Sequence, residues 1–139
     1  MYIHGHMKKI IKVIFPDLNK REVSIELNDS CSPKTVRAIL DNLPIEVNIN
    51  RWGDELYTEK TAIIVEKEEG AKAEVNLLDV AYWPEGHALC LFYGPTPISI
   101  PEKILAYSPV NIVGRIIVSN NEKEDVLERI KDSTRVIIK

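Results

Sequence analysis

The pattern that most constrains this fold is a series of short apolar runs, rich in isoleucine and valine, with turn residues between them. The alternation is strictest in the segment 45–50, where Ile45, Val47 and Ile49 alternate with polar residues and therefore point to one face of a strand. Helical periodicity is rarer, and no strand-helix-strand rhythm repeats along the chain. The chain is therefore predicted to be mainly β.

About eight strands are expected from these runs. The continuous apolar run at Ala88–Tyr93 is typical of a strand that is buried on both sides. Gly114, inside another apolar run, indicates a bulge or a close approach of two backbones, as at the corner of a barrel. The expected strands are 8–15, 22–27, 45–52, 60–66, 73–82, 88–93, 110–118 and 134–138.

Two short helices are expected to cover the ends of this sheet. The first follows Ser32, a residue suited to a helix N-cap, has an apolar stripe at helical spacing, and stops at Pro44. The second is expected at 122–131, after Asn120 and Asn121. Many short strands without a repeat favour a closed antiparallel barrel, and a mixed α+β sheet is the alternative.

Length, charge and composition limit the classes of protein to which this chain can belong. With 139 residues, one domain is expected, spanning 7–139, and residues 1–6 are expected to be an added leader or a disordered N-terminus. The net charge of -3 lacks the basic footprint of a nucleic-acid-binding protein. No apolar run has membrane-spanning length. Cys31 and Cys90 form no disulfide pattern, so the cytoplasm is the expected compartment.

Several kinds of catalytic site are excluded by the residues present. Beyond the first six residues the chain has a single histidine, His87, and it has no motif of a serine hydrolase, a P-loop, a zinc protease or a dinucleotide fold. Neither a metal nor a cofactor is expected.

Arg51 is the first candidate for function. It follows Ile49 in the same alternating phase, so its side chain is expected at the mouth of whatever the strand lines. A buried guanidinium needs a partner, because an unpaired buried charge is costly. The partner is either a structural carboxylate, from Asp54, Glu55 or Asp79, or a ligand.

An aromatic and polar set surrounds Arg51 in the predicted loops and strand ends. These side chains are core and rim packing residues, or they form an apolar groove with one cation that grips a carbonyl or carboxylate. The candidate ligand-binding residues are Arg51, Trp52, Tyr57, Tyr82, Trp83, His87, Phe92 and Tyr93.

The order of these motifs resembles that of the cyclophilins, which are barrel-shaped peptidyl-prolyl isomerases. The helix opening at 32–36, the strand that ends in Arg51 and the run Val110–Arg115 carry this resemblance. The segments 48–57, 79–97 and 108–115 resemble more closely the small prokaryotic cyclophilin-like proteins, whose function is uncharacterised. The resemblance implies a closed cyclophilin-like antiparallel β-barrel and makes Arg51 the candidate catalytic residue.

Three functions follow as hypotheses. The first is binding of a small molecule or a short peptide in a groove at Arg51. The second is prolyl isomerisation of a proline-containing peptide, although Trp52-Gly53-Asp54 replaces the residues that follow the arginine in true cyclophilins. The third is a non-enzymatic interaction module anchored by Trp52 and Trp83, with a homodimer as one form of it.

Overall fold

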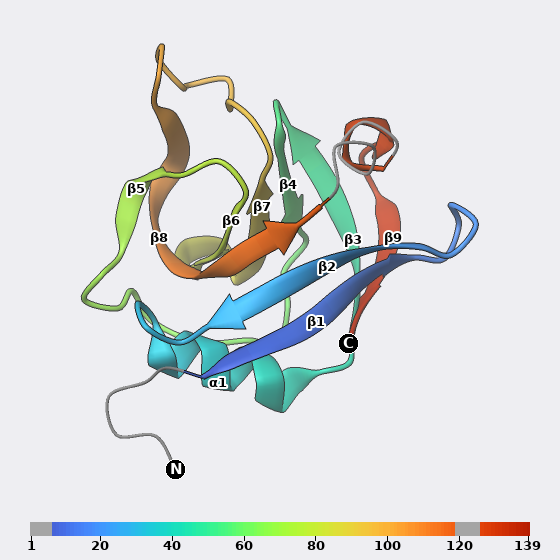
Figure 1. Cartoon of the computed structure of the whole chain (residues 1–139), viewed down its shortest axis with the longest axis horizontal. Coiled ribbons are helices and arrows are strands. Elements are labelled where there is room, and N and C mark those ends of the chain that lie inside the picture. The colour runs from blue at the N-terminus through green and yellow to red at the C-terminus, as the bar shows by residue number, and fades with distance from the viewer. Residues whose placement is uncertain (1–6, 119–125) are drawn as a thin grey trace.

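The computed structural model describes residues 7–118 and 126–139 and shows a closed antiparallel β-barrel, which confirms the predicted fold class. Eight strands form the ring in the order β2-β1-β9-β3-β4-β7-β6-β8, and β8 returns to pair with β2 (Figure 1). The strands are β1 Lys8–Phe15, β2 Arg21–Asn28, β3 Ile45–Trp52, β4 Glu55–Thr58, β5 Lys72–Val75, β6 Asp79–Trp83, β7 Ala88–Phe92, β8 Ile104–Ile117 and β9 Thr134–Ile138.

The barrel interior is filled by the apolar residues that alternate along each strand. On β2 the predicted inward set, Val23, Ile25 and Leu27, is buried, as is Ile49 on β3. Because side chains two residues apart share a face, the polar residues that alternate with the buried ones point away from the barrel interior, toward solvent.

The helix α1, Pro33–Asn42, lies across one end of the barrel (Figure 1). Val36 and Ile39 are buried and carry its apolar stripe. Ser32 is at the N-cap position as predicted, but its side chain makes no capping hydrogen bond. The Glu68 carboxylate accepts hydrogen bonds from the backbone N–H groups of Lys34 and Thr35 instead, which suits the positive end of the helix dipole.

The strand predicted at Lys60–Glu66 is wrong. Thr61 and Ile63 are buried as strand alternation requires, but this segment pairs with none of the described strands. Its backbone is satisfied by single contacts: the Ile63 carbonyl accepts a hydrogen bond from the Tyr82 hydroxyl at 2.6 Å, and the Thr61 N–H donates to the His87 carbonyl at 2.9 Å. Alternation therefore reported burial correctly, but strand formation also needs a pairing partner.

The single strand predicted at 73–82 is two strands, β5 and β6. A turn separates them, in which Leu78 has a positive φ of 72° and the Asn76 N–H donates to the Asp79 carboxylate. The second predicted helix is also corrected, because its described part is a 3-10 turn at Leu127–Arg129. Residues 119–125, which include the predicted cap, lie outside the described residues, as do residues 1–6.

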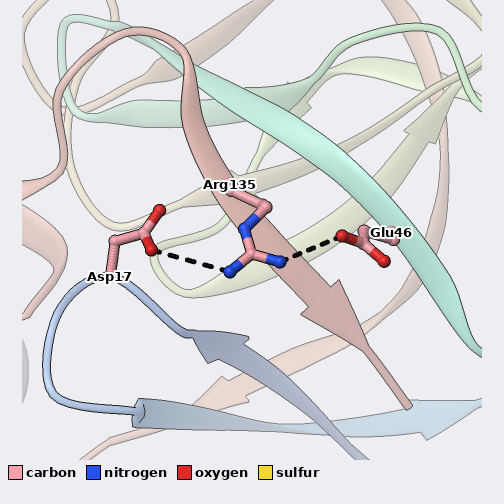
Figure 2. Close-up of polar contacts among 3 residues, drawn as sticks. All are labelled: Asp17, Glu46 and Arg135. Atoms are coloured by element: carbon pink, nitrogen blue, oxygen red, sulfur yellow. Dashed lines mark hydrogen bonds and ion pairs between the residues drawn. The ribbon is translucent and has the colours of Figure 1, made fainter.

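The strand β9 lies between β1 and β3, and one of its side chains links the elements on either side. Arg135 approaches Asp17, in the turn after β1, at 3.6 Å and Glu46 on β3 at 3.0 Å (Figure 2). Both carboxylates raise the pKa of Arg135. Because all three groups are exposed, water screens the pairs, and they serve register more than stability.

A second apolar layer lies outside the barrel. The first half of β8, together with β5, covers the outer face of β6 and β7, and Val75, Ala81, Cys90, Phe92, Ala106 and Val110 are buried there. β7 therefore has Leu89 and Leu91 in the barrel core and Cys90 and Phe92 in this outer layer, as its continuous apolar run predicted.

Gly114 allows β8 to contribute residues both to the outer apolar layer and to the barrel core. The register of β8 against β6 shifts beside it, which confirms the predicted bulge. A Cβ atom at position 114 would lie 2.1 Å from the Glu26 carbonyl oxygen on β2. The close approach of β2 and β8 at the barrel corner thus requires glycine.

Candidate functional site

A cavity of about 190 Å³ lies between the outer face of the barrel and the first half of β8. Four of its eight lining residues are aromatic, three are small or apolar residues of β7 and β8, and one is the acidic Glu55 of β4. The lining residues are Trp52, Glu55, Tyr57, Trp83, Cys90, Ala106, Tyr107 and Val110.

Strand geometry brings these residues together from five strands. Glu55 and Tyr57 are two apart on β4 and share its outer face. Cys90 on β7 is the register partner of Tyr57, so the two side chains are neighbours. Trp52 ends β3, in the opposite phase to Arg51.

The aromatic walls have fixed orientations. Tyr107 meets Trp52 with ring centroids 6.2 Å apart and Trp83 with centroids 5.8 Å apart, both edge to face. The Trp83 indole Nε1 donates a hydrogen bond of 2.7 Å to the Ser108 hydroxyl. Edge-to-face contacts stabilise such ring clusters, so the two indoles are held apart as walls of the cavity.

Glu55 is the unusual polar group of the cavity. It is only 6% exposed, and its Oε1 atom has no hydrogen-bond partner among the described residues. Burial raises the pKa of Glu55 to about 7, and the Cys90 thiol beside it lowers it in part. Burial, followed by the Glu55 carboxylate, holds the pKa of Cys90 well above its usual range, so Cys90 stays a thiol. A buried carboxyl without a full set of partners and with a shifted pKa, lining a cavity, is a candidate functional group.

Arg51 lies near the end of β3, in the same phase as Ile49, at the end of the barrel that we call its mouth, and outside the lining of the cavity. Its Nε donates to the Ile130 carbonyl at 2.8 Å and one terminal nitrogen to the Leu127 carbonyl at 2.6 Å. The other terminal nitrogen donates to the Gly53 carbonyl and to the Tyr93 hydroxyl. Among the described residues these partners, rather than the expected carboxylates, surround the guanidinium.

The predicted ligand-binding set is therefore divided among separate places. Trp52, Tyr57 and Trp83 line the cavity, and Phe92 is buried in the apolar layer beneath it. Tyr93 contacts Arg51 at the barrel mouth, where the guanidinium lies 5.6 Å from the ring centroid. Tyr82 and His87 hold the segment 61–65 instead, through the Ile63 carbonyl.

Sequence reasoning missed Glu55, Cys90 and Tyr107 as site residues. Glu55 had a usable signal, since it shares a strand face with Tyr57. Tyr107 had none, because it lies in a segment, Gly94–Pro109, that contains four prolines and has no strand or helix pattern. Across 7–118 and 126–139 there is no cluster of three or more histidine, cysteine or acidic residues suited to a metal ion. In the same ranges no helix is long and apolar enough to cross a lipid bilayer.

The raised pKa of Glu55 predicts a pH dependence of stability. The folded protein binds a proton that the unfolded chain releases between pH 4.5, the ordinary value, and about 7. The free energy of unfolding should therefore fall as pH rises through this window, by about 3 kcal/mol in total. Glu55→Gln should remove this contribution, measured as urea midpoints across the window. Glu59→Gln, at an exposed position next to β4, should keep the wild-type profile. Parallel profiles for wild type and Glu55→Gln would contradict the assignment.

A protein family and a solved structure each match nearly the whole chain. The model of the family described as cyclophilin-like matches residues 9–139. The solution structure of the hypothetical protein AF2241 from Archaeoglobus fulgidus is 41% identical, covers 99% of this chain and 98% of its own, and superposes with a TM-score of 0.76.

A more distant structure shares the fold. McbB, solved in complex with tryptophan, is 16% identical with a TM-score of 0.69, and the match covers 93% of this chain but 44% of McbB. No curated protein matches the chain.

Proposed function

This chain belongs to the cyclophilin-like family, and on that premise we propose that its outer cavity binds a small molecule with a flat apolar body. The observation that carries the proposal is the four-ring wall of Trp52, Tyr57, Trp83 and Tyr107 around an open cavity. Apolar pockets with a few polar groups are the usual form of small-molecule sites.

The size of the cavity limits what enters it. An engineered protein cavity of about 150 Å³ holds benzene, so about 190 Å³ accommodates one ring or a small fused system. Larger parts of a ligand would extend past Tyr107, which is 69% exposed. The tryptophan complex of McbB, a protein of the same fold, supports small-molecule binding as the kind of function.

Replacing Tyr107 by alanine should weaken ligand binding without unfolding the protein, because this ring is exposed but forms one wall. Suitable probes are phenethyl alcohol, phenethylamine and phenylpropanoate, which share a ring and differ at the end group. Affinity for whichever of them binds should fall about tenfold, given the energy of an aromatic ring contact. Calorimetry measures it, with Leu77→Ala as the control, an exposed apolar truncation. No binding of any probe would reject the proposal.

The other predicted functions stay predictions with their own tests. Prolyl isomerisation requires accelerated cis/trans exchange of a test peptide, a reaction that is slow when uncatalysed. An interaction module or homodimer requires association in solution that Trp52→Ala or Trp83→Ala weakens. Both cysteines are free, Cys31 exposed and Cys90 buried, which supports our proposal of a cytoplasmic location.

A further inference from the structure

The charge of the described cavity lining is of one sign, because the lining has an acidic residue and no basic one. The lining residues with oxygen or sulfur in the side chain are Glu55, Tyr57, Cys90 and Tyr107, and among the described lining residues none carries a positive charge. The nearby guanidinium of Arg51 is occupied by carbonyls and by Tyr93. Glu55 therefore has no cationic partner from the described part of the chain.

Glu55 has one free hydrogen-bonding position. The Oε1 atom is buried and without a hydrogen-bond partner among the described residues, in a side chain that itself lines the cavity. Leaving such an atom unsatisfied is costly, and a ligand that donates a hydrogen bond to it removes the penalty. A charged donor does so about twice as strongly as a neutral one.

The aromatic walls favour the same ligand chemistry. Ring faces attract cations, most strongly those of tryptophan, and the attraction grows when the cation leaves water. Two indoles and two phenols surround the cavity that Glu55 lines. An anionic ligand would meet the negative faces of the rings and the carboxyl group, with no compensating cation among the described lining residues.

We propose that the cavity selects organic ammonium ions, in which a cationic nitrogen is attached to an aromatic or apolar body and pairs with the Glu55 carboxylate. This inference rests on the proposed function and specifies its ligand class. The ring of the ligand lies among Trp52, Trp83 and Tyr107, and the nitrogen donates to the Glu55 carboxylate.

Binding of this kind is coupled to protonation. The titratable groups that line the cavity with Glu55 are Cys90 on β7, Tyr57 on β4 and Tyr107 on β8, and Tyr57 has its pKa raised by burial first. Glu55 changes charge near neutral pH, since its pKa is about 7. Affinity for an ammonium ion should therefore fall as pH drops below that value, when the carboxylate takes up a proton.

The experiment compares the three probes that share one ring. The chain has two tryptophans, and both line the cavity, so selectively excited tryptophan fluorescence reports on this site. At about pH 8, phenethylamine should bind about tenfold more tightly than phenethyl alcohol, as a charge-assisted hydrogen bond predicts. Phenylpropanoate should bind most weakly. At about pH 5.5 the affinity for the amine should fall at least tenfold.

Glu55→Gln tests the role of the carboxylate, since the amide keeps the size and removes the charge. It should abolish both the preference for the amine and its pH dependence, while phenethyl alcohol still binds. Glu59→Gln, at an exposed position near the end of β4, should change neither. Should Glu55→Gln unfold, the pH profile of the wild-type protein decides alone.

The outcomes separate the two proposals. Equal or tighter binding of phenethyl alcohol would overturn the ammonium inference and leave small-molecule binding intact. An amine preference that survives in Glu55→Gln would likewise overturn it. Failure of all three probes to bind would overturn both.

Discussion

Arg51→Ala should lower the free energy of unfolding by about 3 kcal/mol, because hydrogen bonds to a charged group contribute roughly 1.5–3 kcal/mol each. The guanidinium connects three carbonyls, on Gly53, Leu127 and Ile130, and the Tyr93 hydroxyl. Its loss leaves the carbonyls of the 3-10 turn without donors and frees that turn from β3. Urea unfolding measures the change.

Two further variants distinguish geometry from charge. Arg51→Lys keeps the charge but lacks the planar fork that reaches several acceptors, so it should recover little of the lost stability. Arg37→Ala, at an exposed position on α1, should change stability by less than about 0.5 kcal/mol.

Arg51→Ala also tests the ligand-binding role that the sequence predicted for Arg51. Since Arg51 lies outside the cavity lining, folded Arg51→Ala should bind the phenethyl probes with wild-type affinity. A variant of unchanged stability that no longer binds them would instead make Arg51 a ligand-contacting residue.

Gly114→Ala should destabilise the barrel by about 3 kcal/mol or more, because the added methyl group meets backbone rather than a flexible side chain. The nearest atoms are the Glu26 carbonyl oxygen at 2.1 Å and the Leu27 Cα at 3.0 Å. Both belong to β2, whose pairing with β8 closes the ring. Relief of the clash therefore requires these strands to separate at the closing position.

Thermal unfolding of the alanine variant measures this effect. Gly70→Ala is the matched control, because its added Cβ would lie 3.4 Å from the nearest atom, the Cys31 carbonyl oxygen. That variant should unfold within a few degrees of wild type. A Gly114→Ala protein as stable as the control would show that β2 and β8 can move apart at no cost.

Most of the barrel was predictable because its strands alternate strictly between a dry and a wet face. The errors in the strand predictions share one cause, since alternation reports burial and contains no information on pairing. Residues 60–66 alternate but have no neighbour to pair with. The segment 73–82 changes phase at Leu78, where the positive φ turns the chain.

The candidate site was only partly predictable. Trp52, Tyr57 and Trp83 line the cavity, and the ligand-binding role of all eight candidates stays a prediction. Arg51 was made the first candidate because it continues the alternating phase of Ile49, and the aromatic residues were grouped around it. Adjacent residues on a strand point to opposite faces, so Arg51 lies at the barrel mouth and Trp52 lines the cavity. Tyr107 reached the site through the fold of β8, which no local pattern encodes.

The position of β9 between β1 and β3 has a consequence for synthesis of the protein. During translation, strands β1 to β8 emerge first, and until β9 leaves the ribosome β1 and β3 each keep an unpaired edge. At about 5–20 residues per second, the nascent chain spends seconds as an open sheet with exposed isoleucine-rich strands. The chain should therefore be most prone to aggregation on the ribosome rather than after release, and truncation before Thr134 should yield a protein that associates through these edges.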